Sequence, residues 1–272
     1  MRTLYVSDLD GTLLNPRAVL SPFSAAILRE RIETGLDFTV ATARTAATVL
    51  PLMREAGLRL PVILMNGVLI YDIARDIYTQ VLTIGETACR EVFALLRARG
   101  VTGFAYTVED NRMHTFYENL DAPHRRAFYE ERRERYHKEF THIPDFAALA
   151  GRPVVYLSLF DREEVLRPVR EALASLPVHC EFYRDIYDPA LWYLELSSPQ
   201  AAKSRAALRL KEEGGFDRLV SFGDNFNDLS LFSVSDAAYA VANARPEVQA
   251  AATAVIDGND RDGVARWLRD NT

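Results

Sequence analysis

Short apolar runs alternate with amphipathic helical patterns at both ends of this chain, and this alternation limits the possible folds more than any other feature. Residues 2–7 and 36–41 have the composition of buried strands, and a helical pattern over residues 21–34 separates them. A third apolar run, residues 61–67, closes on a turn signal. Because strands separated by helices usually pair in parallel, the pattern predicts a doubly wound parallel sheet of the α/β class.

The middle of the chain, residues 83–197, has a different pattern. A helical segment followed by two alternating apolar runs occurs at residues 85–119 and again at residues 161–197. Alternation with a period of two is typical of antiparallel strands that bury one face. We therefore expect an inserted α+β domain over residues 83–197, and a core domain formed by residues 1–82 and 198–272.

The composition argues against several classes of partner. The chain carries a formal net charge of -6, whereas nucleic-acid-binding proteins usually carry a basic surplus. Cys89 and Cys180 are far apart in the sequence, which fits a reducing compartment. No apolar run approaches the ~20 residues that a membrane-spanning helix needs, and Asp8 and Asp10 interrupt the place of a signal peptide's apolar region. We expect a cytoplasmic protein without a nucleic-acid or membrane partner, and its oligomeric state stays open.

Polar clusters follow three of the expected strands, with the sequences SDLDGT, ATART and GDNFND. In an open α/β sheet, ligands bind beyond the carboxyl ends of the strands, and a parallel sheet brings those ends to one edge. In extended backbone the side chains of Asp8 and Asp10 would point the same way. An ordinary turn is the alternative explanation for this pair, because aspartate and glycine are common turn residues.

Acidic side chains recur beyond the expected strands, where they would repel one another unless a cation lay among them. The candidates are Asp8, Asp10, Asp224 and Asp228. Their hard carboxylate oxygens suit Mg²⁺, which typically binds through one or two carboxylates together with water and a substrate phosphate. The alternative for Asp224 and Asp228 is a structural role, as a cap and a first-turn residue of the helix that follows.

Lys203 supplies a positive charge in an expected helix that begins after Ser198, with Pro199 at its first position. A lysine near a helix start opposes the helix dipole, but the helix start and the ammonium could attract a phosphate together. A solvated surface lysine is the alternative. Thr42 offers a hydroxyl at the end of the second strand, or it caps the helix that follows.

These segments resemble a known family. DLDGTLL, ATAR, Lys203 and GDNFND resemble, in order and approximate spacing, the four sequence motifs of the haloacid dehalogenase (HAD) superfamily. The inserted domain resembles the α/β cap of the Cof-type phosphatases. The resemblance covers essentially the whole chain and implies a Rossmann-like core with a cap that selects the substrate. Ala43 and Ser204 depart from the subgroup's pattern, since glycine, which lets the backbone approach a phosphate closely, is common there.

The resemblance also implies roles for the four acidic residues. Asp8 would be the nucleophile that forms an aspartyl-phosphate, and Asp10 would be the general acid and then the general base. Mg²⁺ would bind Asp8, Asp224 and the backbone carbonyl of Asp10. Asp228 would support the shell of the metal.

Further polar residues would organise the phosphate. The resemblance implies this role for Thr42, Lys203 and Asn227. Arg44 and Asn66 also follow expected strand ends and could face the site. The alternatives are an ion pair on a helix surface for Arg44 and an ordinary turn for Asn66.

The sequence therefore predicts a Mg²⁺-dependent phosphatase that acts on a small phosphorylated metabolite, either a sugar phosphate or a cofactor-precursor phosphate. A sugar phosphomutase of the same superfamily is an alternative, and so is a non-catalytic regulator that binds a phosphorylated metabolite. Within the inserted domain, four residues could meet a substrate and the sequence does not rank them: Tyr106, Arg112, His114 and Tyr183.

Overall fold

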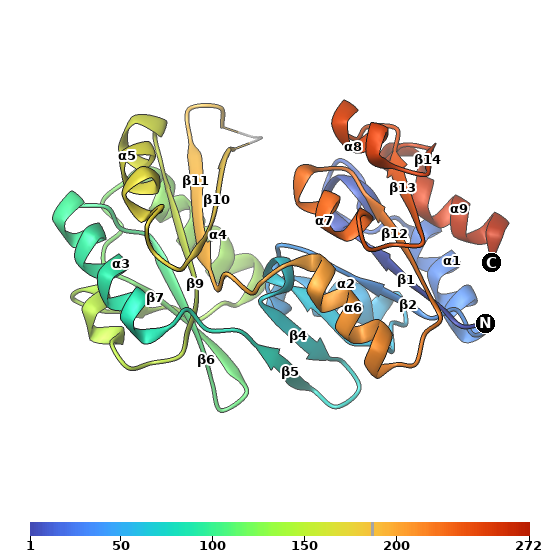
Figure 1. Cartoon of the computed structure of the whole chain (residues 1–272), viewed down its shortest axis with the longest axis horizontal. Helices are drawn as coiled ribbons and strands as arrows, with labels where there is room; N and C mark the ends of the chain where they lie inside the picture. The colour runs from blue at the N-terminus through green and yellow to red at the C-terminus, as the bar shows by residue number, and fades with distance from the viewer. Residues whose placement is uncertain (186–187) are drawn as a thin grey trace. The chain divides into compact units, whose positions relative to one another are not determined.

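The computed structural model describes residues 1–185 and 188–272, and the chain folds as two compact units (Figure 1). Residues 1–80 and 202–272 form the first unit, and residues 81–201 form the second. The domain borders expected from the sequence, after residues 82 and 197, stay a prediction. Each unit has its own sheet structure and hydrophobic core.

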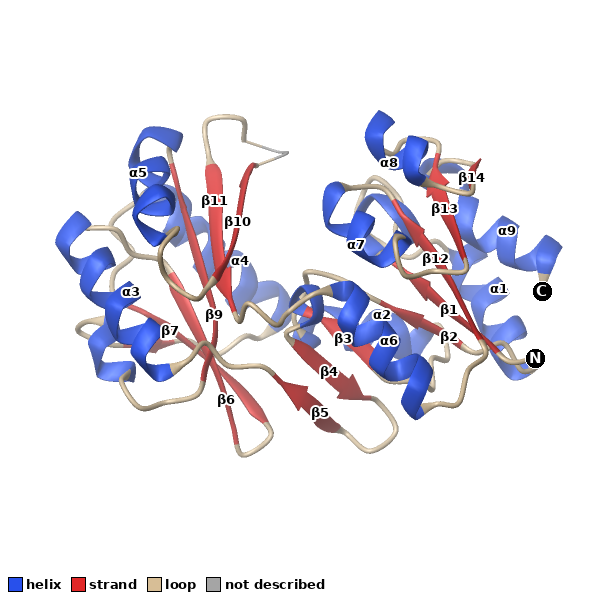
Figure 2. Cartoon of the chain, viewed as in Figure 1, coloured by secondary structure: helices blue, strands red, loops and turns tan. Residues whose placement is uncertain are grey.

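A five-stranded sheet forms the centre of the first unit. Its strands are β1 Thr3–Ser7, β2 Phe38–Val40, β12 Arg218–Gly223, β13 Ala237–Val241 and β14 Ala254–Ile256. Their order is β14–β13–β12–β1–β2, and all neighbours are parallel (Figure 2). The parallel core sheet expected from the alternating pattern is therefore confirmed.

Helices cover both faces of this sheet, as in a doubly wound fold. They are α1 Pro22–Glu33, α2 Ala46–Glu55, α6 Lys203–Glu213, α7 Leu229–Phe232, α8 Pro246–Ala251 and α9 Gly263–Asn271. Leu4 and Val6 of β1 pack in one cluster with Ala207 of α6, whereas Tyr5 contacts Trp267 of α9. Successive side chains of a strand point to opposite faces, which explains this division. Within the described residues, no helix has the length and apolarity that crossing a bilayer requires.

The third apolar run belongs to a separate three-stranded sheet. β3 Val62–Leu64 pairs antiparallel with β4 Leu69–Asp72, which lies beside β5 Ile77–Val81. A single parallel bridge links β3 to the residue after β2. The expected strand is present and meets the parallel sheet through this bridge, but its regular ladder is with β4, which the sequence pattern did not predict. The short helical turn Met65–Gly67 reverses the chain directly after β3, so that β4 becomes its partner.

The second unit is built on a six-stranded sheet. Its strands are β6 Phe104–Glu109, β7 Arg112–Tyr117, β8 Thr141–His142, β9 Val154–Asp161, β10 His179–Arg184 and β11 Trp192–Ser197. Their order is β10–β11–β9–β6–β7–β8, and all neighbours are antiparallel except β7 and β8. An inserted module of mainly antiparallel strands is therefore confirmed.

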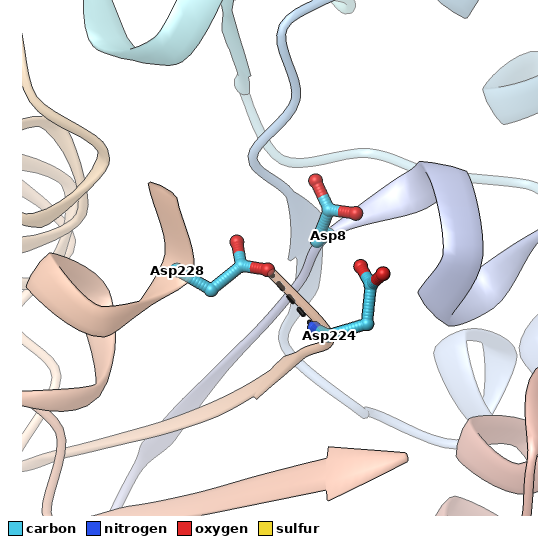
Figure 3. Close-up of side chains that lie close together, drawn as sticks. All are labelled: Asp8, Asp224 and Asp228. Atoms are coloured by element: carbon cyan, nitrogen blue, oxygen red, sulfur yellow. Dashed lines mark hydrogen bonds between the residues drawn. The ribbon is translucent and has the colours of Figure 1, made fainter. Parts of the chain in front are cut away.

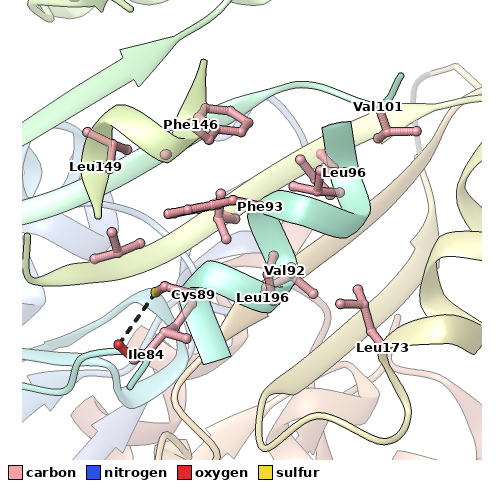
Figure 4. Packing of buried hydrophobic residues seen from close by; sticks show 14 of the residues in the cluster. Ile84, Cys89, Val92, Phe93, Leu96, Val101, Phe146, Leu149, Leu173 and Leu196 are labelled. Carbon is pink, nitrogen blue, oxygen red and sulfur yellow. Dashed lines mark hydrogen bonds between the residues drawn. The ribbon is translucent and has the colours of Figure 1, made fainter. Parts of the chain in front are cut away.

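The two faces of the six-stranded sheet carry different helices. α3 Glu86–Arg99 and α5 Glu163–Leu173 cover one face, and Figure 4 shows part of the buried hydrophobic cluster beneath them. α4 Pro123–Tyr136 packs on the opposite face, where Phe128 stacks on Phe104 with ring centroids 4.7 Å apart.

Helix α6 begins later than the sequence pattern predicts. A start at Pro199 behind a Ser198 cap is wrong, because the helix begins at Lys203 and Ala202 occupies the N-cap position. A Cβ atom on Gly67 would lie 2.3 Å from the carbonyl oxygen of Ala202, so the backbone before α6 packs directly on the turn after β3. This contact places Lys203 at the first helical residue.

Candidate functional site

The lysine that opens α6 is buried between two carboxylates. Asp8 immediately follows β1, and Asp228 ends the short helical turn Phe226–Asp228 after β12. The Lys203 ammonium donates hydrogen bonds to Asp8 Oδ1 over 2.6 Å and to Asp228 Oδ1 over 2.7 Å. Only 1% of the Lys203 side chain is exposed. The alternative of a solvated surface lysine is therefore wrong.

Asp224 completes a cluster of three carboxylates (Figure 3). One oxygen from each of Asp8, Asp224 and Asp228 lies within 4.8 Å of the others. The Thr12 hydroxyl donates to Asp224 Oδ1 over 2.9 Å. The backbone N–H groups of Asp224 and Asn225 donate to Asp228 Oδ2 over 3.0 and 3.1 Å. The cluster forms because the loops after β1 and β12 leave neighbouring parallel strands at the same edge.

The three carboxylates share this space with one ammonium. Burial alone would lower the pKa of Lys203, but the charges of Asp228 and Asp8 outweigh it and hold that pKa above its ordinary value. Burial raises the pKa of Asp8 well above its ordinary value, against the opposite effect of Lys203. Burial and the charge of Asp228 raise the pKa of Asp224 to about 6. The carboxylates therefore repel one another, and a bound cation would relieve this repulsion.

The donor set of the cluster fits a hard divalent cation. All three side chains offer carboxylate oxygens, the ligands that Mg²⁺ and Ca²⁺ prefer over sulfur or imidazole. Hydrogen bonds already orient Asp224 and Asp228, as the supporting groups of metal ligands commonly do. Asp8, Asp224 and Asp228 together thus suggest a metal site.

The carboxylate of Asp10 lies in a different environment from that of Asp8. The chain bends after Asp8 through the helical turn Leu9–Leu13, in which Gly11 has a φ of +79°. Half of the Asp10 side chain is exposed, and the Arg44 guanidinium donates two hydrogen bonds to it. Arg44 Nε lies 2.7 Å from Oδ2, and Nη2 lies 2.5 Å from Oδ1. Sequence reasoning missed this ion pair, although both residues follow neighbouring strands.

Thr42, Asn66 and Asn227 lie along one path of hydrogen bonds. The Thr42 carbonyl accepts from the Asn66 N–H over 2.9 Å, and the Asn227 side-chain amide donates to Asn66 Oδ1 over 3.3 Å. The Thr42 hydroxyl oxygen accepts from the Arg44 N–H over 3.2 Å. Helix α2 begins only at Ala46, so the alternative of Thr42 as its cap is wrong. A phosphate-binding role for these side chains stays a prediction.

The chain is similar to one protein family along nearly its whole length. The model of the haloacid dehalogenase-like hydrolase family matches residues 5–268. The pyridoxal phosphate phosphatase YbhA of Escherichia coli is 24% identical, over 96% of this chain and 95% of its own length. The 5-amino-6-(5-phospho-D-ribitylamino)uracil phosphatase YwtE of Bacillus subtilis is also 24% identical, with the same coverage of both chains.

Solved structures share the fold of the whole chain. The crystal structure of a haloacid dehalogenase-like hydrolase from Bacteroides thetaiotaomicron matches with a TM-score of 0.83. The match covers 100% of both chains at 22% sequence identity. At this identity the likeness shows the fold, and the similarity extends over the parallel sheet and the inserted module alike.

Proposed function

This chain belongs to the family of haloacid dehalogenase-like hydrolases and is a phosphatase that acts on small phosphorylated compounds, and we propose that it works through an aspartyl-phosphate on Asp8 with Mg²⁺ as its cation. The observation that carries this proposal is the burial of Lys203 between Asp8 and Asp228, beside Asp224. A carboxylate nucleophile is repelled by a phosphate dianion. A fixed ammonium and a cation site at the nucleophile relieve this repulsion.

The first half-reaction would transfer the phosphoryl group to Asp8. A carboxylate oxygen of Asp8 attacks phosphorus, and a P–O bond forms as the bond to the leaving alcohol breaks. Asp10 donates its proton to the leaving oxygen. Lys203, Thr42 and Asn227 bind the phosphate oxygens and orient the group for attack.

The second half-reaction would release inorganic phosphate. Asp10, now a carboxylate, accepts a proton from water as the water oxygen attacks phosphorus. The bond between phosphorus and Asp8 breaks, and both carboxyl groups return to their starting states. Arg44 orients Asp10 for both proton transfers through its paired hydrogen bonds.

The cation would be held by Asp8, Asp224 and Asp228, with the backbone carbonyl of Asp10 as a further ligand. Mg²⁺ is the proposed ion because it typically binds carboxylate oxygens together with the phosphate oxygens of a substrate. When bound, it neutralises charge on the carboxylates and on the phosphate oxygens. Burial, together with the charges of the neighbouring carboxylates, raises the pKa values of Asp8 and Asp224, and this crowding supports the assignment.

The substrate class that we propose is a sugar phosphate or a phosphorylated cofactor precursor. The names of the two relatives state phosphatase activity toward pyridoxal phosphate and toward a ribitylaminouracil phosphate. At 24% identity these names support the class and not a single compound.

A screen of phosphorylated metabolites tests this function. With Mg²⁺ supplied, we expect release of inorganic phosphate from several members, ranked by kcat/KM. Because three carboxylates crowd one site, removal of the cation with EDTA should lower activity at least ~100-fold, and added Mg²⁺ should restore it. Full activity in EDTA would contradict the metal assignment. Isomer formation without free phosphate would indicate a phosphomutase, and tight binding without turnover would indicate a regulator.

A Gly11→Ala variant tests the geometry around the cation site. Alanine is strained at a φ of +79°, and its Cβ would lie 2.5 Å from Asp224 Oδ2. Because Asp224 must then move, we expect kcat/KM to fall at least ~10-fold and half-saturation to need more Mg²⁺. Gly151→Ala is the matched control, since Gly151 has a φ of +81° and nothing lies within 4 Å of its added Cβ. Equal activity of the two variants across a Mg²⁺ titration would contradict the prediction.

A further inference from the structure

One face of the six-stranded sheet carries a group of polar and aromatic side chains from four strands. Tyr106 of β6 lies across from Tyr156 of β9, and Glu195 of β11 lies across from Glu181 of β10. The strand neighbours of these residues, such as Ala105, belong to the hydrophobic cluster under α3 and α5. Because side chains alternate along a strand, the polar group occupies the opposite face.

The strand register places two glutamates directly opposite each other. Like charges at opposed positions of an antiparallel pair destabilise the pair. Burial and the charge of Glu181 raise the pKa of Glu195 to about 7, although hydrogen bonds with Tyr156 and Tyr183 act in the other direction. Glu195 Oε2 is buried, and in the described part of the chain it has no hydrogen-bond partner. A buried carboxylate oxygen of this kind is costly to keep unless it binds something.

Aromatic rings border the two glutamates. Tyr183 stacks on Tyr193 with ring centroids 5.5 Å apart, and Tyr193 stacks on Phe160 at 5.1 Å. The faces of such rings attract cations. Tyr183 is 41% exposed, so this end of the aromatic row is open to solvent.

The lysine on the same face, Lys138, contacts an aromatic ring. The Lys138 ammonium lies 4.4 Å from the centre of the Tyr106 ring. Burial and the charge of Arg132 lower the pKa of Lys138 to about 7. The neighbouring charge that shifts the pKa of Lys138 is therefore the guanidinium of Arg132. The neighbouring charge that shifts the pKa of Glu195 is the carboxylate of Glu181. Tyr106 and Tyr156 lie between Lys138 and the two glutamates, and their rings are in edge-to-face contact with centroids 6.1 Å apart.

We propose that Glu195 and Glu181, with the hydroxyls of Tyr156 and Tyr183, bind the ammonium group of a small amine-bearing molecule. The ammonium donates a hydrogen bond to Glu195 Oε2 and neutralises the opposed charges. The amine belongs either to the leaving group of the substrate, in which case the inference rests on the proposed function, or to a separate effector. Of the four residues that the sequence could not rank, Tyr106 and Tyr183 belong to this face.

The first arm of the test compares substrates that differ only in an amine and a hydroxyl. The pairs are pyridoxamine 5′-phosphate with pyridoxine 5′-phosphate, and glucosamine 6-phosphate with glucose 6-phosphate. If the amine belongs to the substrate, the wild type should prefer the amine of at least one pair. Glu195→Gln should lower kcat/KM for that amine about tenfold, because a charge-assisted hydrogen bond is lost, and should leave its hydroxyl partner nearly unchanged.

The second arm measures calorimetric binding of the free amines glucosamine and pyridoxamine against glucose and pyridoxine. Amine-selective binding that Glu195→Gln removes, without a change of substrate preference, would assign the site to a separate effector. If neither turnover nor binding distinguishes amines through Glu195, the proposal is overturned. If the wild type released no phosphate from any substrate, the proposed function would be contradicted, but the calorimetric measurement would still test amine binding.

Two further variants separate a binding role from a structural one. Glu171→Gln removes an exposed glutamate from α5, which covers the other face of the sheet, and should change neither arm. Glu181→Gln should weaken amine selectivity in the same direction as Glu195→Gln. Because either site variant relieves like-charge repulsion, its melting temperature without ligand should equal or exceed that of the wild type. A lower melting temperature with unchanged amine selectivity would assign Glu195 a structural role and overturn the proposal.

Discussion

An Asp8→Asn variant is expected to fold normally and to lose hydrolysis of every substrate, with kcat lowered at least ~10⁴-fold. Asparagine keeps the shape of the side chain that contacts Lys203, but a neutral amide is too weak a nucleophile to form the aspartyl-phosphate. The substitution also removes one of three crowded negative charges, so the melting temperature and the far-UV circular dichroism spectrum should remain close to the wild type.

Asp110→Asn is the matched control for this experiment. Asp110 is exposed in the turn between β6 and β7 at a φ of +48°, a conformation that asparagine also tolerates, so full activity is expected. Mass spectrometry of acid-quenched enzyme should find a phosphate on the peptide that contains Asp8 in the wild type and none in Asp8→Asn. A folded Asp8→Asn variant that retained more than about 1% of wild-type kcat would remove Asp8 from the role of nucleophile.

The core sheet could be predicted from the sequence because local composition decides most of it. β1 and β12 are apolar strands, and α1, which follows β1, has a recognisable start in Ser21 and Pro22. The start of α6 could not be predicted in this way. Ser198 and Pro199 have the composition of a helix start, but the packing of Ala202 on Gly67 is a tertiary contact that sequence pattern does not contain.

The pairing of β3 with β4 could not be predicted from the sequence for a related reason. Met65 and Asn66, which follow the strand, have φ values of +49° and +53°. Side chains other than glycine seldom adopt this conformation, and composition gives no signal for it at methionine. The tight reversal that these residues allow places β4 antiparallel beside β3. A propensity argument therefore finds the strand but gives no signal for its antiparallel partner.

The acid cluster follows from sheet geometry that the sequence does contain. Ser7 and Phe222 are register partners, so the loops that begin with Asp8 and Asp224 must leave the sheet close together. The ion pair of Asp10 with Arg44 depends on the bend after Asp8, which local pattern does not specify. The position of Glu181 directly across from Glu195 could likewise not be predicted from the sequence, because strand register is set by packing over the whole sheet.

A Lys203→Met variant is expected to lose about 3–5 kcal/mol of unfolding free energy near pH 8 in EDTA. Methionine fills a similar volume, but it leaves Asp8 and Asp228 without the ammonium that binds both. Phosphate release should fall severely as well, because the proposed cation alone would then offset the repulsion between the nucleophile and the substrate. Lys211→Met on the same helix is the control. Its surface pair with Asp236, at 3.2 Å, should contribute less than about 1 kcal/mol.

The pH dependence of Lys203→Met distinguishes a buried charge from a packing defect. Burial already raises the pKa of Asp8, and the loss of Lys203, which acts to lower it, should raise it further. A carboxyl group with a raised pKa in the folded state binds its proton more tightly there than in the unfolded chain. The ionised group therefore destabilises the folded state most at pH values above the folded pKa. This destabilisation disappears as the pH falls toward the pKa of the unfolded chain, near 4. In urea unfolding, the variant should recover much of its lost free energy between about pH 8 and about pH 5, and Lys211→Met should not. If the loss of unfolding free energy were the same at both pH values, lost packing, and not an unpaired carboxylate, would destabilise the variant.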